Sequence, residues 1–271
     1  MRSAVTISLV PEARGGPFVF WDGIAAGCAN AASLGFDAIE IYPSSAEELD
    51  VGDIVHRLAA HGLRCAAMGT GAGWVKHRLR LTDPDAGLRR KALGFATRIV
   101  EAAGTLGAPA IVGSMQGRSG DGATREQTLG WLAEALAALA EGAARHGVPL
   151  LYEPLNRDDT NLFNRQAEAA EFLGAMGLGN VMLLCDLFHM SIEEADIADA
   201  LRVAGTLVGH VHFADSNRLA MGWGNTDMAP IMAALREIGY AGYLSAEILP
   251  LPDSVSAARQ TMLSFRRWTT V

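Results

Sequence analysis

The sequence predicts an α/β protein with a single domain over residues 1–271, folded as a closed (β/α)8 TIM barrel. Three observations lead to this prediction. Apolar runs of strand length alternate with longer segments of helical periodicity along the whole chain. Of the 271 residues, 50% are hydrophobic, which is enough for one large core. Glycine tolerates the left-handed backbone that ends helices, and it marks seven helix-to-strand junctions: Gly35, Gly62, Gly107, Gly147, Gly179, Gly205 and Gly239.

The expected strands lie between these junctions and lack a polar face, which is typical of strands covered on both sides of a parallel sheet. The eight strands are Ala4–Val10, Ala38–Tyr42, Leu63–Met68, Pro109–Val112, Pro149–Glu153, Val181–Asp186, Thr206–Phe213 and Gly242–Glu247.

The helices between them are expected from apolar residues at helical spacing and from capping signals. Ser45 with Glu48, and Thr124 with Gln127, have the spacing of a capping box, and Asp227 can cap a later helix. The expected helices cover 21–34, 85–106, 165–176, 192–204, 227–238 and 254–268, with two more that open at Ser45 and at Thr124. An open doubly wound sheet is the alternative, but its glycine-rich dinucleotide signature is missing after every expected strand.

The charge, the apolar runs and the cysteines of the sequence argue against several classes of protein. The formal net charge is −8, and no run of Lys or Arg offers a surface for phosphates, so nucleic acid is not expected as a partner. No apolar run reaches the ~20 residues that span a bilayer, and the N-terminus lacks a clear signal peptide, so we expect no membrane partner. Cys28, Cys65 and Cys185 are scattered, as in proteins of a reducing compartment, and a cytoplasmic location is expected.

Four consecutive expected strands end in a residue that can bind a metal ion. These residues are Glu153, Asp186, His212 and Glu247. Because the carboxyl ends of parallel barrel strands meet at one rim, the four side chains should converge there. Three carboxylates and one imidazole would repel one another without a cation, and an oxygen-rich set suits Mn²⁺, Mg²⁺ or Co²⁺ better than a structural zinc.

One ambiguity concerns the strand 206–213, which carries both His210 and His212. We expect only one of the two imidazoles to face the barrel interior and the other to face the helices. His212 is the preferred ligand, because it lies nearer the carboxyl end of the strand.

The segments around these residues match a known family. The matching motifs are YEPLNR at 152–157, CDLFHMSIEE at 185–194, HVHFADSNR at 210–218, GWGNTD at 222–227 and SAEI at 245–248. On these motifs the chain resembles the sugar isomerase/epimerase barrels, which include D-tagatose 3-epimerase, hydroxypyruvate isomerase and other xylose isomerase-like proteins. The resemblance follows nearly the whole chain in strand order and is densest between residues 150 and 250.

The resemblance implies a metal-dependent isomerase or epimerase of a ketose or keto-sugar acid. It implies one divalent metal, preferably Mn²⁺ with Mg²⁺, Co²⁺ or Zn²⁺ as alternatives, held by Glu153, Asp186, His212 and Glu247. Glu153 and Glu247 would also serve as the acid/base pair. His189 and Arg218 would hold substrate hydroxyls, although a supporting role for His189 and an ion pair of Arg218 with Asp215 remain open. A homo-oligomer, either a dimer or a tetramer, is also implied.

The implied chemistry is consistent with these side chains. A metal ion that polarises a carbonyl makes the neighbouring C–H more acidic, and two carboxylates on opposite faces can remove and return the proton. Glu153 and Glu247 end strands that are three apart on an eight-strand ring, which suits access from two sides. Alternatives are a lyase resembling inosose dehydratases, a phosphodiesterase resembling endonuclease IV and a sugar-binding barrel without catalysis.

The identity of the substrate is the feature that the sequence defines least. The segment ILPLPD after the last strand has neither glycine nor a basic residue, so an unphosphorylated sugar or sugar acid is expected. The loop with Trp74, Lys76 and His77 is expected to line the far end of the substrate, with Trp21 and Trp223 as further apolar walls.

Overall fold

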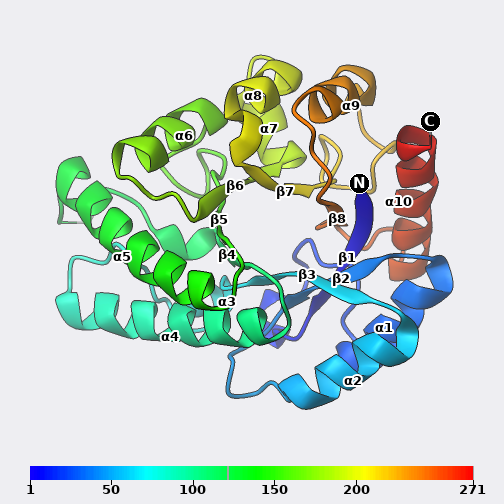
Figure 1. Ribbon diagram of the computed structural model, residues 1–271, viewed down its shortest axis with the longest axis horizontal. Helices are drawn as coiled ribbons and strands as arrows, with labels where there is room; N and C mark the ends of the chain where they lie inside the picture. The colour runs from blue at the N-terminus through cyan, green and yellow to red at the C-terminus, as the bar shows by residue number, and fades with distance from the viewer. Residues whose placement is uncertain (121, 271) are drawn as a thin grey trace.

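A closed barrel of parallel strands forms the centre of the protein, in a computed structural model that describes residues 1–120 and 122–270 (Figure 1). Each strand pairs with its neighbour in sequence order, and β8 closes the ring by pairing with β1. This confirms the predicted (β/α)8 barrel; of the predicted domain range, residues 121 and 271 lie outside the described residues. The strands are β1 Arg2–Ser8, β2 Ala38–Tyr42, β3 Arg64–Gly69, β4 Ala110–Val112, β5 Leu150–Tyr152, β6 Val181–Asp186, β7 Val208–His212 and β8 Tyr243–Ala246.

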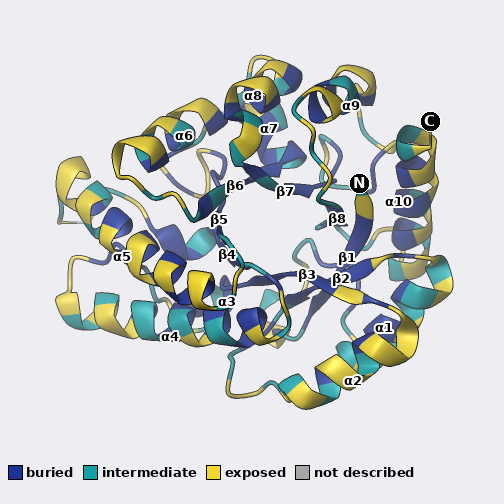
Figure 2. Cartoon of the chain, viewed as in Figure 1, coloured by how far each residue is buried: buried dark blue, intermediate teal, exposed yellow. Residues whose placement is uncertain are grey.

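The strands are buried on both faces, and the helices around them are exposed only on their outer sides (Figure 2). β4 and β5 illustrate this pattern, since every residue of Ala110–Val112 and Leu150–Tyr152 is buried. Continuous apolar runs are therefore the sequence signature of these strands, as expected for a sheet with a covered outer face and a packed interior.

Helices connect the strands and surround the barrel (Figure 1). They are α1 Gly23–Leu34, α2 Val51–His61, α3 Ala72–Val75, α4 Ala86–Thr105, α5 Arg125–Arg145, α6 Gln166–Ala175, α7 Leu187–Glu193, α8 Ile197–Ala204, α9 Met228–Glu237 and α10 Ser254–Thr269, with 3-10 turns at Pro11–Ala13, Ser114–Gln116 and Gly205–Leu207. Two of the expected caps are confirmed. Thr124 and Gln127 form a capping box on α5, and the Asp227 side chain accepts the Ala229 N–H at the start of α9.

The expected capping box at Ser45 is wrong. α2 begins at Val51, and its cap is Asp50, whose Oδ1 accepts the N–H of Asp53 at 2.9 Å. Aspartate is at least as good a cap as serine, and it stands directly before the amphipathic stretch. Ser45 instead lies in the loop between β2 and α2.

The single helix expected over 192–204 is also wrong, because α7 and α8 occupy this region separately. Asp186 caps α7 immediately after β6, and Asp196 caps α8 by accepting the Asp199 N–H at 2.9 Å. The expected strand 206–213 starts later, at Val208. The left-handed glycine that follows α6 is Gly177, with φ 65°, rather than Gly179.

Cys28, Cys65 and Cys185 are free and buried, so they serve as small apolar side chains in the core. Among the described residues, no helix combines the length and apolar character that crossing a bilayer requires.

Candidate metal centre and active site

The four strand-end residues come together. Glu153, Asp186, His212 and Glu247 each offer one ligand atom, and these atoms lie within 4.8 Å of one another. The Nδ1 atom of His212 is 3.2 Å from Oδ2 of Asp186, 3.5 Å from Oε2 of Glu247 and 3.6 Å from Oε1 of Glu153. Such spacing is what ligands have around one small cation, since metal–oxygen and metal–nitrogen distances near 2.1 Å place neighbouring donors about 3 Å apart.

The electrostatics of this cluster favour a cation. Oε1 of Glu153 is buried and has no hydrogen-bond partner among the described residues. Burial raises the pKa of Glu153 to about 7, and burial also raises the pKa of Glu247. Burial acts against ionisation of Asp186 as well, but the electrostatic interactions with His189 and Arg218 outweigh it and lower the pKa of that carboxyl. A divalent ion would supply the missing partner and favour the ionised forms, so the donor set fits a metal.

The local structure of Asp186 explains how it can point into the cluster. Its Oδ1 accepts the backbone N–H groups of Phe188 at 2.8 Å and His189 at 3.4 Å, which caps α7. Its Oδ2 faces His212. Helix capping therefore fixes the orientation of a carboxylate whose other oxygen is available to a ligand.

Glu153 follows β5, and its backbone is held by Gln116. The Gln116 amide donates to the Glu153 carbonyl at 2.9 Å and to the Gly113 carbonyl at 3.0 Å, and its Oε1 accepts from Tyr152 at 2.6 Å. The carboxylate lies against Gly113, where a Cβ atom would overlap Oε2. Gln116 and Gly113 were not identified from the sequence, and nothing in their sequence context marks them.

His189 and Arg218 also reach the cluster. The Arg218 guanidinium contacts Glu247 and lies 3.4 Å from Oδ2 of Asp186, and it stacks on Phe188 with its carbon 4.7 Å from the ring centre. Nη1 of Arg218 is 3.3 Å from Nε2 of His189. On the other side of the ring, Asn156 donates its backbone N–H to Nδ1 of His189 at 3.2 Å.

Arg157 lies at the edge of this region. It forms a two-point ion pair with Glu193 of α7, with Nε and Nη2 2.9 and 2.8 Å from the two carboxylate oxygens. This pair ties the loop after β5 to α7, and Arg157 itself is exposed.

The possible ion pair between Arg218 and Asp215 is not formed. Asp215 is buried and accepts the backbone N–H groups of its own loop, at Gly222 (2.7 Å), Gly224 (2.9 Å) and Thr226 (3.0 Å). A Cβ on Gly224 would overlap this carboxylate, so the glycine of the GWGNTD segment makes room for it. Asp215 therefore organises the loop that carries Arg218, and Arg218 is free to face Glu247.

The expectation that only one of His210 and His212 faces the barrel interior is wrong. Both imidazoles contact the same interior carboxylate, that of Glu40 on β2, at 2.8 and 3.1 Å. Residues two apart along a strand point to the same face, so the two rings had to share a side. Glu40 was not identified from the sequence, although a lone carboxylate within the apolar run AIEIY was a readable signal.

A cavity of about 320 Å³ opens beside the cluster. Its lining includes Glu40, Glu153, His189, His212, Arg218 and Glu247, together with Phe18, Tyr42, Val75, Leu155 and Asp159. The loop after β3 lines the cavity as expected, through Thr70, Gly71 and Val75. The side chains expected as walls do not line it: Trp21, Trp74, Lys76, His77 and Trp223. Phe18 supplies the aromatic wall instead and stacks on Tyr42 with ring centres 4.3 Å apart.

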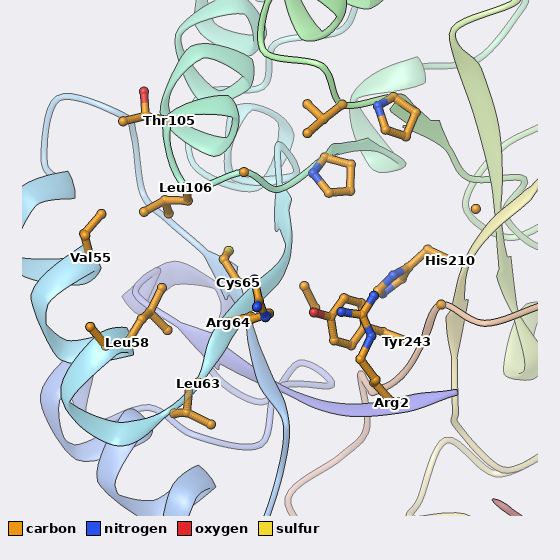
Figure 3. A pocket seen from close by; sticks show the side chains of 18 of the residues that line it. Arg2, Val55, Leu58, Leu63, Arg64, Cys65, Thr105, Leu106, His210 and Tyr243 are labelled. Carbon is orange, nitrogen blue, oxygen red and sulfur yellow. The ribbon is translucent and has the colours of Figure 1, made fainter.

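A larger cavity, of about 730 Å³, opens at the amino-terminal end of the strands and contains none of the four clustered residues (Figure 3). Arg2 lies over the ring of Tyr243 there, 4.1 Å from its centre, and His210 lines the inner wall. In barrels of this kind chemistry takes place at the carboxyl ends of the strands, so the smaller cavity is the candidate active site.

Comparisons with known proteins identify relatives of this chain. The sequence profile of the xylose isomerase-like TIM barrel family matches residues 28–267. An L-ribulose 3-epimerase of Mesorhizobium japonicum is 35% identical over 224 residues, which cover 81% of this chain and 73% of the relative. A D-psicose 3-epimerase of Agrobacterium fabrum is 30% identical, over 80% of this chain and 76% of the relative. A solved structure of an L-ribulose 3-epimerase superposes with a TM-score of 0.82 at 27% identity, covering 98% of this chain and 94% of that one.

Proposed function

The chain belongs to the xylose isomerase-like TIM barrel family, and from this premise we propose that it is a metal-dependent ketose 3-epimerase. The observation that carries the proposal is the meeting of Glu153 and Glu247 with Asp186 and His212 at the edge of one cavity. The two relatives described above are named as 3-epimerases of ketoses, and the lyase alternative draws no support from them.

Glu153, Asp186, His212 and Glu247 would hold one divalent ion. Three carboxylates and one imidazole favour Mn²⁺, with Mg²⁺, Co²⁺ or Zn²⁺ as alternatives. When bound, the ion would polarise the substrate carbonyl and stabilise the negative charge that develops on its oxygen.

Glu153 and Glu247 would be the acid/base pair. One carboxylate removes the proton from C3, next to the carbonyl, to give an enediolate, and the other returns a proton to the opposite face. They extend from β5 and β8, which are three strands apart in the barrel, so they approach a substrate in the cavity from different sides. In the metal-free protein, burial raises the pKa of both carboxyls, so each can hold a proton inside the cavity.

His189 and Arg218 would bind substrate oxygens. Nδ1 of His189 lies 3.2 Å from the Asn156 N–H, and Nε2 lies beside Arg218 and the cavity. Burial lowers the pKa of His189 to about 4, so the ring is neutral at physiological pH. Arg218 adds a permanent positive charge that can hold hydroxyls or a carboxylate.

The proposed substrate is an unphosphorylated ketose or keto-sugar acid. The cavity volume lies at the low end of the ~300–1,000 Å³ typical of ligand sites, which suits a single sugar. Arg218 is the only Lys or Arg side chain among the residues that line it, and the loop after β8 adds no basic group. A single domain over 1–271, assembly into a dimer or tetramer and a cytoplasmic location are part of the same proposal.

Proton exchange in D2O tests the proposed reaction directly. Protein loaded with Mg²⁺, which does not broaden the resonances, is incubated with a panel of ketopentoses, ketohexoses and keto-sugar acids and followed by proton NMR. Deuterium should appear at C3 together with the C3 epimer, and both Glu153→Gln and Glu247→Gln should abolish the exchange.

Other outcomes would replace the proposal. Deuterium at C1 with formation of an aldose would indicate an aldose–ketose isomerase. Loss of water with a new enone absorbance would indicate a lyase. A protein that binds metal and sugars without exchanging any proton would be a binding protein.

A further inference from the structure

We infer that Glu40 is a positioning residue for the proposed metal ligand His212, an inference that rests on the metal site of the proposed function. Glu40 lies on β2, outside the quartet of β5 to β8, and its carboxylate reaches His212 on β7 through the barrel interior. In this arrangement Glu40 holds the imidazole so that Nδ1 faces Asp186, Glu153 and Glu247.

The two nitrogens of the His212 ring face different partners. Nε2 lies 3.1 Å from Oε1 of Glu40, whereas Nδ1 lies 3.2 Å from Oδ2 of Asp186. Both nitrogens face a carboxylate, which can only accept a hydrogen bond, so the one proton of a neutral ring stays on the nitrogen that the proposed metal does not take. An ion held by Asp186, Glu153 and Glu247 would take Nδ1, which leaves the proton on Nε2 to donate to Glu40. The lone pair is then on Nδ1, where the three carboxylates converge. A metal-bound histidine that donates its other N–H to a carboxylate has a fixed tautomer, a fixed ring orientation and a more basic ligand nitrogen.

The Glu40 carboxylate is itself fixed. Its second oxygen, Oε2, lies 2.8 Å from Nε2 of His210, and the His210 and His212 rings are 5.6 Å apart and nearly perpendicular, at 86°. Both rings are 1% exposed and Glu40 is 4% exposed, so bulk water does not compete for these bonds. A buried carboxylate needs hydrogen-bond donors, and the two imidazoles on one strand face supply them.

The strand order shows which residues next to His212 could have held its ring instead of Glu40. β2 is separated from β7 by β1 and β8, so Glu40 contacts His212 across the barrel rather than along a strand pair. The neighbour of His212 on β8 is Ser245, which is too short to hold the ring: its hydroxyl is buried and has no partner among the described residues.

A second reading is that Glu40, His210 and His212 form another metal site, since one ligand atom of each lies within 4.8 Å of the others. The positioning role is favoured because a neutral His212 that binds the quartet's ion through Nδ1 keeps its proton on Nε2, which then donates to Glu40 and cannot bind a second metal. The number of metal ions bound per chain distinguishes the positioning role from a second metal site.

The test measures metal binding rather than turnover. Metal-free wild-type protein, Glu40→Gln and Glu40→Leu are titrated with Mn²⁺ by calorimetry, and the thermal stability of each metal-free protein is recorded. Glu40→Leu should bind Mn²⁺ about 10–100-fold more weakly than wild type, as is typical when a hydrogen-bond partner of a metal ligand is removed. Glu40→Gln keeps an oxygen that can accept from Nε2 and should lose less affinity.

Ser245→Ala is the matched control, because Ser245 is buried in the same interior next to His212 but makes no hydrogen bond through its hydroxyl to any described residue. It should bind Mn²⁺ as wild type does. If Glu40→Leu has lower metal-free stability but an unchanged Mn²⁺ dissociation constant, Glu40 is only structural and the inference is overturned. Two Mn²⁺ ions per wild-type chain, with one lost in Glu40→Leu, would overturn it in favour of the second metal site.

A proton resonance gives an independent test. It uses Glu40→Gln, so it can still be carried out if Glu40→Leu folds poorly. In Mg²⁺-loaded wild type, the Nε2–H of His212 should give a downfield signal that Glu40→Gln shifts upfield. An unshifted signal in a folded Glu40→Gln would contradict the inference. Failure of wild type itself to bind Mn²⁺ or Mg²⁺ would instead refute the proposed function, so the two failures are distinguishable.

Discussion

Gly113 leaves the space that the carboxylate of Glu153 occupies, since a Cβ atom at residue 113 would overlap Oε2 of that side chain. We predict that Gly113→Ala displaces the Glu153 carboxylate while the barrel remains folded. A displacement of about 1 Å at a reacting group can cost about 10²-fold, so kcat should fall by 10- to 100-fold. Steady-state kinetics with a substrate found by the D2O panel measures the change.

Gly130→Ala is the control for this variant, because a Cβ at residue 130 of α5 meets no atom within 4 Å. It should retain wild-type kcat and gain slightly in stability from the better helix propensity of alanine. Equal kcat in Gly113→Ala and wild type would show that the position of Glu153 is not critical.

Asp215 is predicted to control substrate affinity through its loop. Asp215→Ala removes the acceptor of several backbone N–H groups, which should lower the free energy of unfolding by about 1–3 kcal/mol and displace Arg218. The KM should therefore rise at least 10-fold. Asp227→Ala, which removes an exposed helix cap on α9, should cost about 1 kcal/mol with an unchanged KM. Chemical denaturation and kinetics of both variants separate the loop effect from a general loss of stability.

The pH dependence of the metal-free protein should show the raised pKa of Glu153. Burial raises this pKa from 4.5 to about 7, so the folded protein binds a proton more tightly than the unfolded chain. The corresponding stability is complete below pH 4.5 and is lost as the pH rises to about 7, by at most roughly 3 kcal/mol. Denaturation of wild type and Glu153→Gln between pH 4 and 8 measures it. The stability difference between the two proteins should change in favour of the variant as the pH rises.

Metal removal should lower both activity and thermal stability. Chelated protein should be inactive, and adding Mn²⁺ at 100 times its dissociation constant should restore about 2.7 kcal/mol of stability. Asp186→Asn keeps an oxygen that can cap α7 but loses the charge of the proposed ligand, so it should fold yet gain little from Mn²⁺. An equal Mn²⁺ stabilisation of Asp186→Asn and wild type would exclude Asp186 as a ligand.

Free ketoses should be better substrates than their phosphates. Among the residues that line the cavity, Arg218 is the one Lys or Arg side chain, and it already pairs with Glu247 and Asp186. A phosphate group would therefore lack donors of its own. Comparing kcat/KM for a ketose and for its terminal phosphate tests this, and a higher value for the phosphate would refute the expected substrate class.

Most of the barrel was predictable from local patterns. The apolar runs and the glycine junctions identified all eight strands, because strands that are buried on both faces cannot carry a regular polar pattern. Errors arose where two local signals competed. Asp50 caps α2 in place of Ser45, and Asp186 starts a short α7 directly after β6. Several residues near a boundary can cap a helix, and only the path of the chain selects among them.

The sequence by itself determined which four side chains end β5 to β8, since parallel strands of a barrel always bring these ends to one rim. Tertiary structure decided what holds them in place. Glu40 meets His212 from across the barrel, Gly113 makes room for Glu153, and the Asp215 loop leaves Arg218 facing Glu247. These contacts join residues far apart in the chain, and they depend on how strand tilt and stagger close the barrel. No spacing along the sequence encodes that geometry. The four clustered side chains could therefore be predicted from the sequence, whereas the contacts that hold them could not.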